Sequence, residues 1–280
     1  MIPDMLFDAF RGFVLGAIQG LTEFFPVSSS GHLILVPILF GWPDQGLAFD
    51  TVMHLGTLAA LLWFFRRELI SLAVRFFKRD ADGRRARIFV LKLVVATVPA
   101  VIAAFLLKEL IETTFRSGRL VAFNLALWGL ILLWADRSAV SGKDETSPPI
   151  DGQSVESVSW KQAVAVGLAQ PLALIPGTSR SGITITAGLF SGLSRAAAAR
   201  FSFFLSIPVT AGAGLSGLLD VFEQGSGSEG ILPLAIGFLS ATIWGLFAIR
   251  FLLSYVAKRR YDLFVAYRLA LALVVFLLVA

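Results

Sequence analysis

The chain contains no cysteine, and this absence removes several kinds of chemistry at once. Without thiols there is no disulfide framework, no thiol nucleophile and no cysteine-ligated metal site. Histidine is nearly absent too, because the 280 residues include only His32 and His54. A metal cage built from several histidines is therefore excluded as well.

Charged residues are also scarce, at 15% of the sequence against about a quarter in soluble domains. Hydrophobic residues make up 56%, and several apolar stretches of about 16 to 21 residues are long enough to cross roughly 30 Å of hydrocarbon. The sequence therefore predicts an all-α integral membrane protein. The net charge of +5 does not indicate a nucleic-acid partner, because the basic residues cluster between apolar stretches, as in membrane topology.

Six apolar stretches predict full transmembrane spans, at about 47–65, 88–107, 120–135, 201–219, 231–253 and 263–280. Two further regions, about 10–40 and 162–190, each contain short apolar arms on either side of a polar run. Arms of this length are too short to cross a bilayer at about 1.5 Å per residue. We therefore expect each region to form a re-entrant helix hairpin whose tip stops inside the membrane. Arg11, Gln19 and Glu23 interrupt the first apolar segment, so no cleavable signal peptide is expected.

The two halves of the chain resemble each other. Residues of the first hairpin recur 151 positions later: Gly16/Gly167, Gln19/Gln170, Leu21/Leu172, Ser28/Ser179, Ser30/Ser181 and Gly31/Gly182. This repetition predicts a first repeat at 1–136, a polar cytoplasmic linker at 137–160 and a second repeat at 161–280. One hairpin and three spans per half give an odd number of crossings, so we expect inverted-topology repeats.

Basic residues set the expected orientation. Eight arginines and lysines lie between residues 66 and 87, which places this loop in the cytoplasm. The linker and the basic turn at 258–260 fall on the same side, whereas the 220–230 loop has no Lys or Arg and falls outside. Both termini are then outside, and one hairpin enters from each face of the membrane.

The first hairpin tip carries candidate metal ligands. Gln19 and Glu23 are spaced i, i+4 and therefore share one face of a helix. Their amide and carboxylate oxygens suit Mg²⁺ or Ca²⁺ bound to phosphate groups. An alternative interpretation gives Glu23 a structural role only, as the ion-pair partner of Arg180. Small residues adjoin this pair and would let another helix pack closely: Gly12, Gly16 and Gly20.

Hydroxyl groups and a histidine follow at the same tip: Ser28, Ser29, Ser30 and His32. A serine there can act as a nucleophile, and an imidazole can transfer protons near neutral pH. Serines ahead of an apolar helix also act as N-caps, and we expect this role for one of the three. Ionisable residues of the full spans are not assigned to the site: Asp50, His54 and Lys92.

The second tip combines glycine, hydroxyl groups and one arginine: Gly177, Thr178, Ser179, Arg180 and Ser181. Glycine lets the backbone approach a ligand closely, and the N–H groups that start the following helix attract phosphate. Arg180 adds a bidentate donor. Two tips that meet near the middle of the membrane would join this phosphate cradle to the carboxylate and serines of the first tip.

Two runs of residues carry a family resemblance: 19–33 (QGLTEFFPVSSSGHL) and 176–182 (PGTSRSG). Together they resemble the two motifs of the bacitracin-resistance family of undecaprenyl-diphosphate phosphatases, and length, spacing and membrane pattern agree over essentially the whole chain. The resemblance implies interlocked inverted repeats, a divalent cation and removal of the terminal phosphate from the C55 lipid pyrophosphate. This reaction recycles the lipid carrier for cell-wall synthesis and confers resistance to bacitracin. The resemblance also implies a bacterial inner-membrane location with a site open to the periplasm, and a homodimer is left open.

The resemblance further implies roles for single residues. Glu23 and Gln19 would lie near the metal and the substrate, Ser29 or a neighbour would be the nucleophile, and His32 would transfer protons. Arg180 would bind the phosphates together with the remaining substrate-binding residues: Ser28, Ser30, Gly177, Thr178, Ser179 and Ser181. Some relatives carry Glu at the position of Gln19, so here Glu23 must hold more of the cation. Direct attack by water activated by His32 is the alternative to a phosphoserine.

Two other functions compete with hydrolysis. Inverted repeats with broken helices are also typical of transporters, so a flippase for the lipid phosphate is the main alternative. The Ser, His, Arg and Glu set favours an enzyme, because it is more reactive than a carrier needs. A phosphatase of the phosphatidic-acid type is disfavoured, because it needs a histidine with an aspartate after its Ser-Arg element and no histidine follows Ser179-Arg180.

Overall fold

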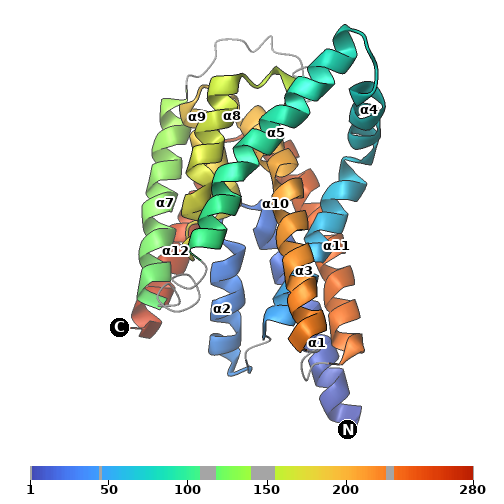
Figure 1. Ribbon diagram of the computed structural model, residues 1–280. Coiled ribbons are helices and arrows are strands. Elements are labelled where there is room, and N and C mark those ends of the chain that lie inside the picture. Colours follow the sequence, from blue (N-terminus) through green and yellow to red (C-terminus); the bar gives the residue numbers. More distant parts are fainter. Residues whose placement is uncertain (1, 44–45, 108–117, 140–154, 225–229, 280) are drawn as a thin grey trace.

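A computed structural model describes residues 2–43, 46–107, 118–139, 155–224 and 230–279. In these ranges every regular element is helical and no strand occurs, and the helices form one elongated bundle (Figure 1). The elements in chain order are α1 (Ile2–Phe24), α2 (Ser29–Phe40), α3 (Gly46–Phe64), α4 (Arg66–Phe76), α5 (Ala81–Leu106), α7 (Gly118–Ser138), the 3₁₀ turn η1 (Val155–Ser157), α8 (Trp160–Ala169), the 3₁₀ turn η2 (Gln170–Leu174), α9 (Arg180–Phe190), α10 (Arg195–Gln224), α11 (Ile231–Val256) and α12 (Asp262–Val279).

Four of the described helices are long and apolar enough to cross a membrane: Ala81–Leu106, Gly118–Ser138, Arg195–Leu215 and Ile231–Val256. Large apolar side chains cover their outer surfaces, and Phe105 and Ile231, for example, are 84% and 85% exposed. Contact with water would be unfavourable for this surface, whereas lipid accommodates it. The protein is therefore an all-helical, multi-pass membrane protein.

The helices lie where the spans are expected, but several are longer. α5 begins at Ala81 rather than near 88, because Asp80 caps it by accepting a hydrogen bond from the Gly83 N–H at 2.8 Å. α10 includes residues 220–224 of the expected outer loop, and residues 225–229 lie outside the described ranges. The expected linker 137–160 begins inside α7, and its residues 140–154 also lie outside these ranges. Polar residues at helix ends lower the hydropathy without ending the helix.

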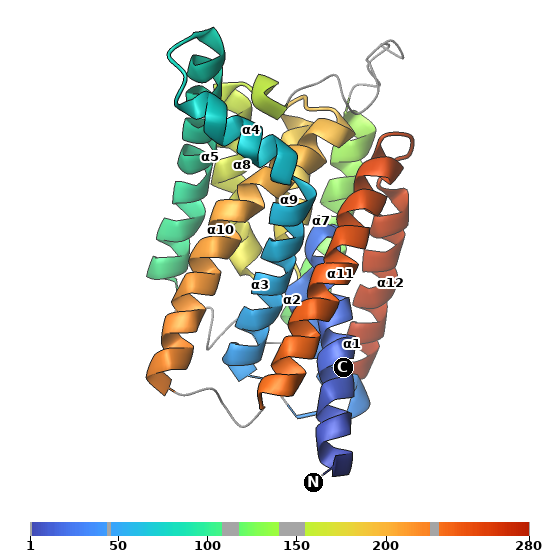
Figure 2. The same ribbon diagram turned by 90° about the vertical axis from the view of Figure 1, so that its right-hand side faces the viewer.

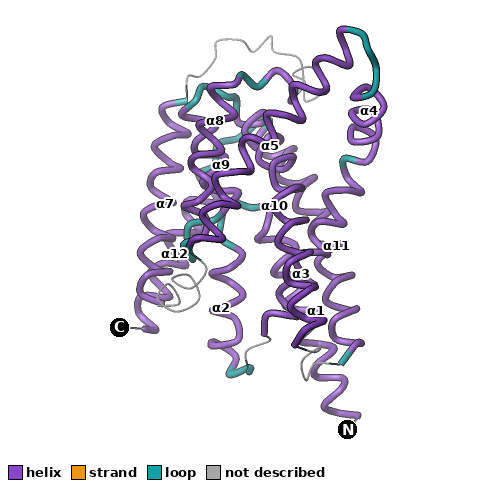
Figure 3. Tube along the Cα trace, in the orientation of Figure 1, coloured by secondary structure: helices purple, strands orange, loops and turns teal. Residues whose placement is uncertain are grey.

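The first expected hairpin has a longer entry arm than predicted. α1 has 23 residues and begins at Ile2 rather than near residue 10, which makes it about 35 Å long, so the expectation of a short first arm is wrong. α2 has 12 residues and ends at Phe40, where the C-cap Gly41 follows with a φ of 63°. Figure 1 shows α2 in the lower half of the bundle and α8 and α9 in the upper half, and Figure 3 shows loop segments near mid-height.

Helices from the two halves of the chain pack closely on each other. α1 packs along α11, α8 packs against α5, and α3 lies against both α10 and α11 (Figure 2). A Cβ atom on Gly12 or Gly20 would lie 2.5 or 2.6 Å from the backbone oxygen of Pro233 or Ala241, respectively. The predicted stripe of small residues is therefore confirmed as a helix-packing surface.

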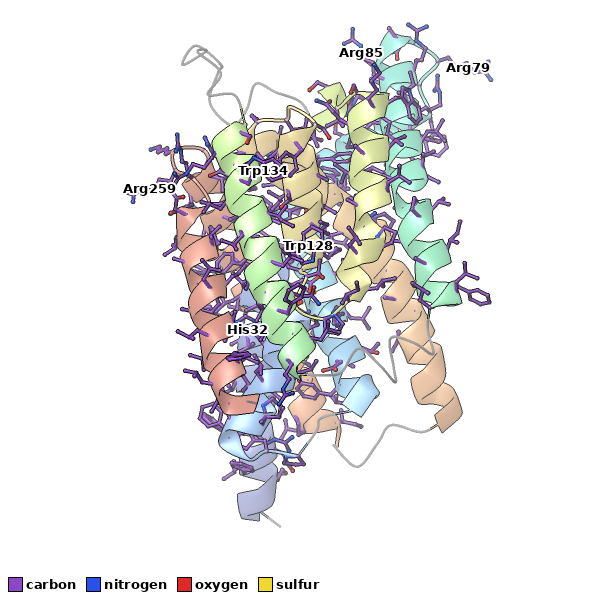
Figure 4. The ribbon with its side chains drawn as sticks, turned by 90° about the vertical axis from the view of Figure 1, so that its left-hand side faces the viewer. His32, Arg79, Arg85, Trp128, Trp134 and Arg259 are labelled. Atoms are coloured by element: carbon purple, nitrogen blue, oxygen red, sulfur yellow. The ribbon has the colours of Figure 1, made fainter. Side chains whose placement is uncertain are left out.

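Basic residues gather at one end of the bundle. Figure 4 shows Arg79, Arg85 and Arg259 at the same end, although they come from segments far apart in the sequence. This arrangement agrees with the expectation that the 66–87 and 258–260 segments share one side of the membrane. Residues 66–76 form the helix α4, where the hydropathy pattern predicts only a loop.

Candidate active site

Two polar loops, residues 25–28 and 175–179, meet inside the bundle. The Ser181 hydroxyl donates to the Phe25 carbonyl oxygen at 2.9 Å. Arg180 Nη2 donates to Glu23 Oε1 at 2.5 Å. The structure thus brings together the two polar tips that lie in separate halves of the sequence.

Ser28 and Ser179 share an uncommon backbone conformation. Their φ angles are 74° and 77°, and no other described non-glycine residue has a positive φ. Each starts a helix: Ser28 Oγ accepts from the Gly31 N–H at 3.4 Å, and Ser179 Oγ accepts from the Gly182 N–H at 3.1 Å. Such strained residues cost about 1–3 kcal/mol and cluster at functional sites. The expected N-cap role within the first tip is confirmed for Ser28.

Gly177 shapes the second loop before its serine cap. Its φ is 90°, and a Cβ atom there would lie 2.5 Å from the Val121 carbonyl oxygen. Both the conformation and the close approach require glycine. Among the predicted substrate-binding residues, Gly177, Ser28 and Ser179 therefore form the loops themselves.

Other groups at the loops carry unpaired hydrogen-bond donors. The first two N–H groups of a helix have no intrahelical acceptor, and no described residue supplies one for Ser29, Ser30, Arg180 or Ser181. Within the described ranges, Arg180 Nη1 and Thr178 Oγ1 are also buried without a partner. This set of donors, placed at the starts of α2 and α9, suits an anion such as phosphate.

Glu23 is the centre of the polar network and is only 7% exposed. Its Oε2 accepts hydrogen bonds from Ser29 Oγ at 2.7 Å and from Gln19 Nε2 at 3.1 Å, while Oε1 accepts from Arg180. A carboxylate in this position can take the hydroxyl proton of Ser29 and so make the oxygen a stronger nucleophile. The arrangement supplies an activated serine next to an arginine.

His32 lies beside α12 (Figure 4) and not against Glu23. Its Nδ1 is 2.7 Å from the Ser28 carbonyl oxygen, and its Nε2 is 2.6 Å from the Tyr267 hydroxyl. The His32 and Tyr267 rings also stack at a centroid distance of 5.6 Å. Because a carbonyl only accepts, Nδ1 carries the proton and Nε2 accepts from Tyr267. In this geometry the group hydrogen-bonded to Ser29 is Glu23, not His32.

His54, which the sequence pattern leaves unassigned, lies against the site. Its Nε2 is 3.9 Å from Glu23 Oε2, and its Nδ1 is 2.7 Å from the Asp50 carbonyl oxygen. The sequence did contain a signal for His54, namely a histidine within an apolar span. Ionisable groups at membrane depth are costly and tend to be functional. Tyr267 offered no such signal, because tyrosine is common near the ends of membrane helices.

Gln19 and Glu23 fit a hard cation in their chemistry. Gln19 Oε1 is buried and has no hydrogen-bond partner among the described residues. These residues contain no group of three or more His, Cys, Asp or Glu side chains that could hold a metal ion alone. Mg²⁺ commonly takes one or two protein carboxylates and completes its shell with water and substrate phosphates. The Gln19–Glu23 pair is therefore compatible with a cation shared with a bound phosphate.

Comparison with known proteins finds relatives along nearly the whole chain. It is similar to proteins named undecaprenyl-diphosphatase from Rubrobacter xylanophilus (44% identical over 96% of this chain and 98% of the relative), Geotalea daltonii (42%, 94% and 96%) and Gemmatimonas aurantiaca (44%, 95% and 96%). A family model described as bacitracin resistance protein BacA matches residues 12–274, which include every site residue from Gln19 to Tyr267. This chain therefore belongs to the bacitracin resistance protein BacA family.

Proposed function

We propose that this protein hydrolyses undecaprenyl diphosphate to undecaprenyl phosphate and inorganic phosphate. The observation that carries the proposal is one buried carboxylate, Glu23, that binds a serine from its own half of the chain and an arginine from the other half. Relatives that match almost the full chain are named undecaprenyl-diphosphatase, and the family description is bacitracin resistance protein. The reaction recycles the lipid carrier that cell-wall synthesis consumes, which fits resistance to bacitracin.

Ser29 is the nucleophile. Its proton passes to Glu23 Oε2, 2.7 Å away, as Oγ attacks the terminal phosphorus. The bond between this phosphorus and the bridging oxygen breaks, undecaprenyl phosphate leaves, and a phosphoserine forms. Water then attacks the phosphoserine, inorganic phosphate leaves, and Ser29 regains a proton. His32, one helical turn after Ser29 on α2, takes part in proton transfer through the Tyr267 hydroxyl that binds its Nε2.

The donors at the loops neutralise the diphosphate. Arg180 holds Glu23 with Nη2, so its unpaired Nη1 remains available for a phosphate oxygen. Thr178 Oγ1 and the N–H groups that start α2 and α9 add neutral donors. Bound Mg²⁺ or Ca²⁺, held by Glu23 and Gln19, would supply further positive charge to the phosphates.

The two halves form inverted repeats with interlocked hairpins, α1–α2 and α8–α9, which are re-entrant because their connecting loops stop inside the bundle, where the hairpins meet. In support, Ser28 and Ser179 are both positive-φ helix caps, and Gln19 and Gln170 both bury an unpaired Oε1. The packing is also reciprocal. α1 of the first half lies on α11 of the second half, and α8 of the second half lies on α5, the first-half counterpart of α11. Arg180 follows Ser179 as Ser29 follows Ser28, so the repeated position supplies the nucleophile in one half and the arginine in the other.

The site opens to the periplasmic side of a bacterial inner membrane. Its more exposed side chains, Ser30 and His54, belong to α2 and α3. Figure 1 shows α2 and the start of α3 at the end of the bundle opposite the α4–α5 connection. The basic residues of that connection favour the cytoplasm. The prenyl tail stays in the bilayer, where each buried CH₂ contributes about 0.8 kcal/mol.

Phosphate release from a C15 or C55 prenyl diphosphate by detergent-purified protein tests this proposal. We expect wild-type release with Mg²⁺ or Ca²⁺ and none with EDTA. Glu23→Gln and Arg180→Met should each lower kcat/KM at least about 100-fold, because the first removes the base that takes the Ser29 proton and the second removes the positive charge beside the reacting phosphate. Glu68→Gln is the matched control, because Glu68 pairs with Arg200 at the surface, and it should keep wild-type activity. Folded wild-type protein that releases no phosphate would contradict hydrolysis and favour a flippase.

A further inference from the structure

Arg268, on α12, is completely buried at 0% exposure. An arginine in the interior of a membrane protein is expensive unless its donors are satisfied. Here all of its hydrogen bonds go to backbone carbonyl oxygens, and no described Asp or Glu side chain is among its partners. The guanidinium is therefore well bound, but none of the described carboxylates forms an ion pair with it.

The partners of Arg268 come from three parts of the fold. Nε donates to the Leu125 oxygen on α7 at 3.1 Å. Nη1 donates to the Pro26 oxygen in the first loop at 3.0 Å and to the Thr178 oxygen in the second loop at 3.1 Å. Nη2 donates to the Gly177 oxygen at 2.9 Å. One side chain thus ties α12 and α7 to both polar loops.

Two neighbouring glycines leave room for the Arg268 side chain, and a neighbouring asparagine makes a similar hydrogen bond to a loop. A Cβ atom on Gly182 would lie 3.0 Å from Arg268 Nη1, and one on Gly129 would lie 3.4 Å from Arg268 Cβ. Asn124 on α7 also binds the second loop, because its Nδ2 donates to the Pro176 oxygen at 3.2 Å. Side-chain donors of α7 and α12 therefore hold the backbone carbonyl groups of the loops.

We propose that Arg268 is a positioning residue for the hydrolysis, which holds the two loops that carry the nucleophile and Arg180. This inference rests on the proposed function. Both loops end in strained serine caps, Ser28 and Ser179, that lead directly into Ser29 and Arg180. Because Arg268 fixes the carbonyl groups just before these caps, it fixes the position of the nucleophile relative to the arginine. A shift of about 1 Å between reacting groups can lower a rate about 100-fold.

Arg268→Met tests the proposal, because methionine fills much of the same space without charge or donors. We expect the variant to fold, kcat/KM to fall at least about 100-fold, and amides of residues 25–31 and 177–182 to exchange hydrogen for deuterium at least about tenfold faster. Lys92→Met is the matched control, since Lys92 is also buried and donates to a carbonyl oxygen, that of Val158 at 2.5 Å, in neither loop. It should leave both measurements at the wild-type level.

Two further variants separate positioning from packing. In Arg268→Ala, guanidinium ion should restore kcat about tenfold while ammonium does not, because only the planar fork can bind carbonyls of both loops. If Arg268→Met does not fold, Arg268→Lys, which keeps the charge but reaches fewer carbonyls, is measured in its place. Wild-type loop exchange in a folded Arg268 variant would overturn the proposal, as would unchanged kcat/KM. Wild-type protein that releases no phosphate would refute the proposed function instead, and the exchange data would still decide whether Arg268 orders the loops.

Discussion

Single residues determine how the site handles protons. Glu23 is hydrogen-bonded to Ser29, whereas Nε2 of His32 is engaged by the Tyr267 hydroxyl. We therefore propose that Glu23 activates the serine and that His32 has a separate part in proton transfer. This division of roles depends on a tyrosine that lies outside both motifs.

Tyr267→Phe should lower kcat about tenfold, because it removes the hydroxyl that orients His32 but keeps the stacked ring. His32→Gln should lower kcat further, because it removes the proton-transfer group itself. Steady-state phosphate release measures both effects. The control is Tyr255→Phe, which retains a ring stacked on Phe251. Wild-type kcat in His32→Gln would remove this histidine from the mechanism.

Gly177→Ala should abolish activity and lower the melting temperature, because its φ is 90° and the new Cβ would lie 2.5 Å from the Val121 oxygen. The control is Gly192→Ala, which has a φ of 84° but no atom within 4 Å of the new Cβ. It should show only the cost of the strained backbone, about 1–3 kcal/mol. Thermal unfolding in detergent compares the two variants, and equal losses would mean that the close approach at Gly177 is unimportant.

At the scale of helices, a buried carboxylate links three helices at the end of the bundle that carries the basic residues. Asp136 of α7 is fully buried, accepts a hydrogen bond from Arg195 Nε of α10, and accepts the Tyr261 N–H before α12 at 3.0 Å. Burial, together with the charge of Asp136, raises the pKa of the Tyr261 phenol. Tyr261 therefore stays protonated and donates to the Arg195 carbonyl oxygen at 3.3 Å.

Asp136→Ala should destabilise the protein by about 3 kcal/mol, because it leaves buried donors without an acceptor. Asp262→Ala removes a comparable ion pair, with Arg137, in which both side chains are about half exposed. It should cost less than about 1 kcal/mol. Chemical denaturation followed by tryptophan fluorescence gives both values. A loss of equal size in the two variants would contradict a stabilising role for the buried network.

Helix positions followed well from the sequence, because long apolar runs have few alternatives in a chain with so little charge. The predicted 47–65 and 231–253 spans nearly coincide with α3 and the core of α11. The ends of α1 and α10 were missed, because hydropathy measures apolar character and polar turns can still be helical. The two motifs identified residues of the site, but not which side chains are hydrogen-bonded to one another, such as Ser29 to Glu23 and His32 to Tyr267. Arg268, His54 and Tyr267 reach the site only through tertiary packing, which spacing along the chain does not encode.

For the molecule as a whole, we propose that the basic end lies in the cytoplasm and that the site opens to the periplasm. The absence of native cysteine makes this directly testable, since single cysteines can be introduced without background. Gly230→Cys, at the exposed position just before α11, should react with a membrane-impermeant maleimide in intact spheroplasts. Arg79→Cys should react only after the membrane is permeabilised. The reverse labelling pattern would invert the orientation and with it the side of the site.

The site exists only because the two halves meet, with the serine and carboxylate from one and the arginine from the other. The most direct test of this account follows a label from the terminal phosphate of a prenyl diphosphate into inorganic phosphate. Wild-type protein and the control Ser240→Ala, whose hydroxyl only donates to the Phe13 carbonyl oxygen, should release the label. Ser29→Ala should release it at least about 1,000-fold more slowly. Release from Ser29→Ala at the wild-type rate would contradict the assignment of the nucleophile and the mechanism built on it.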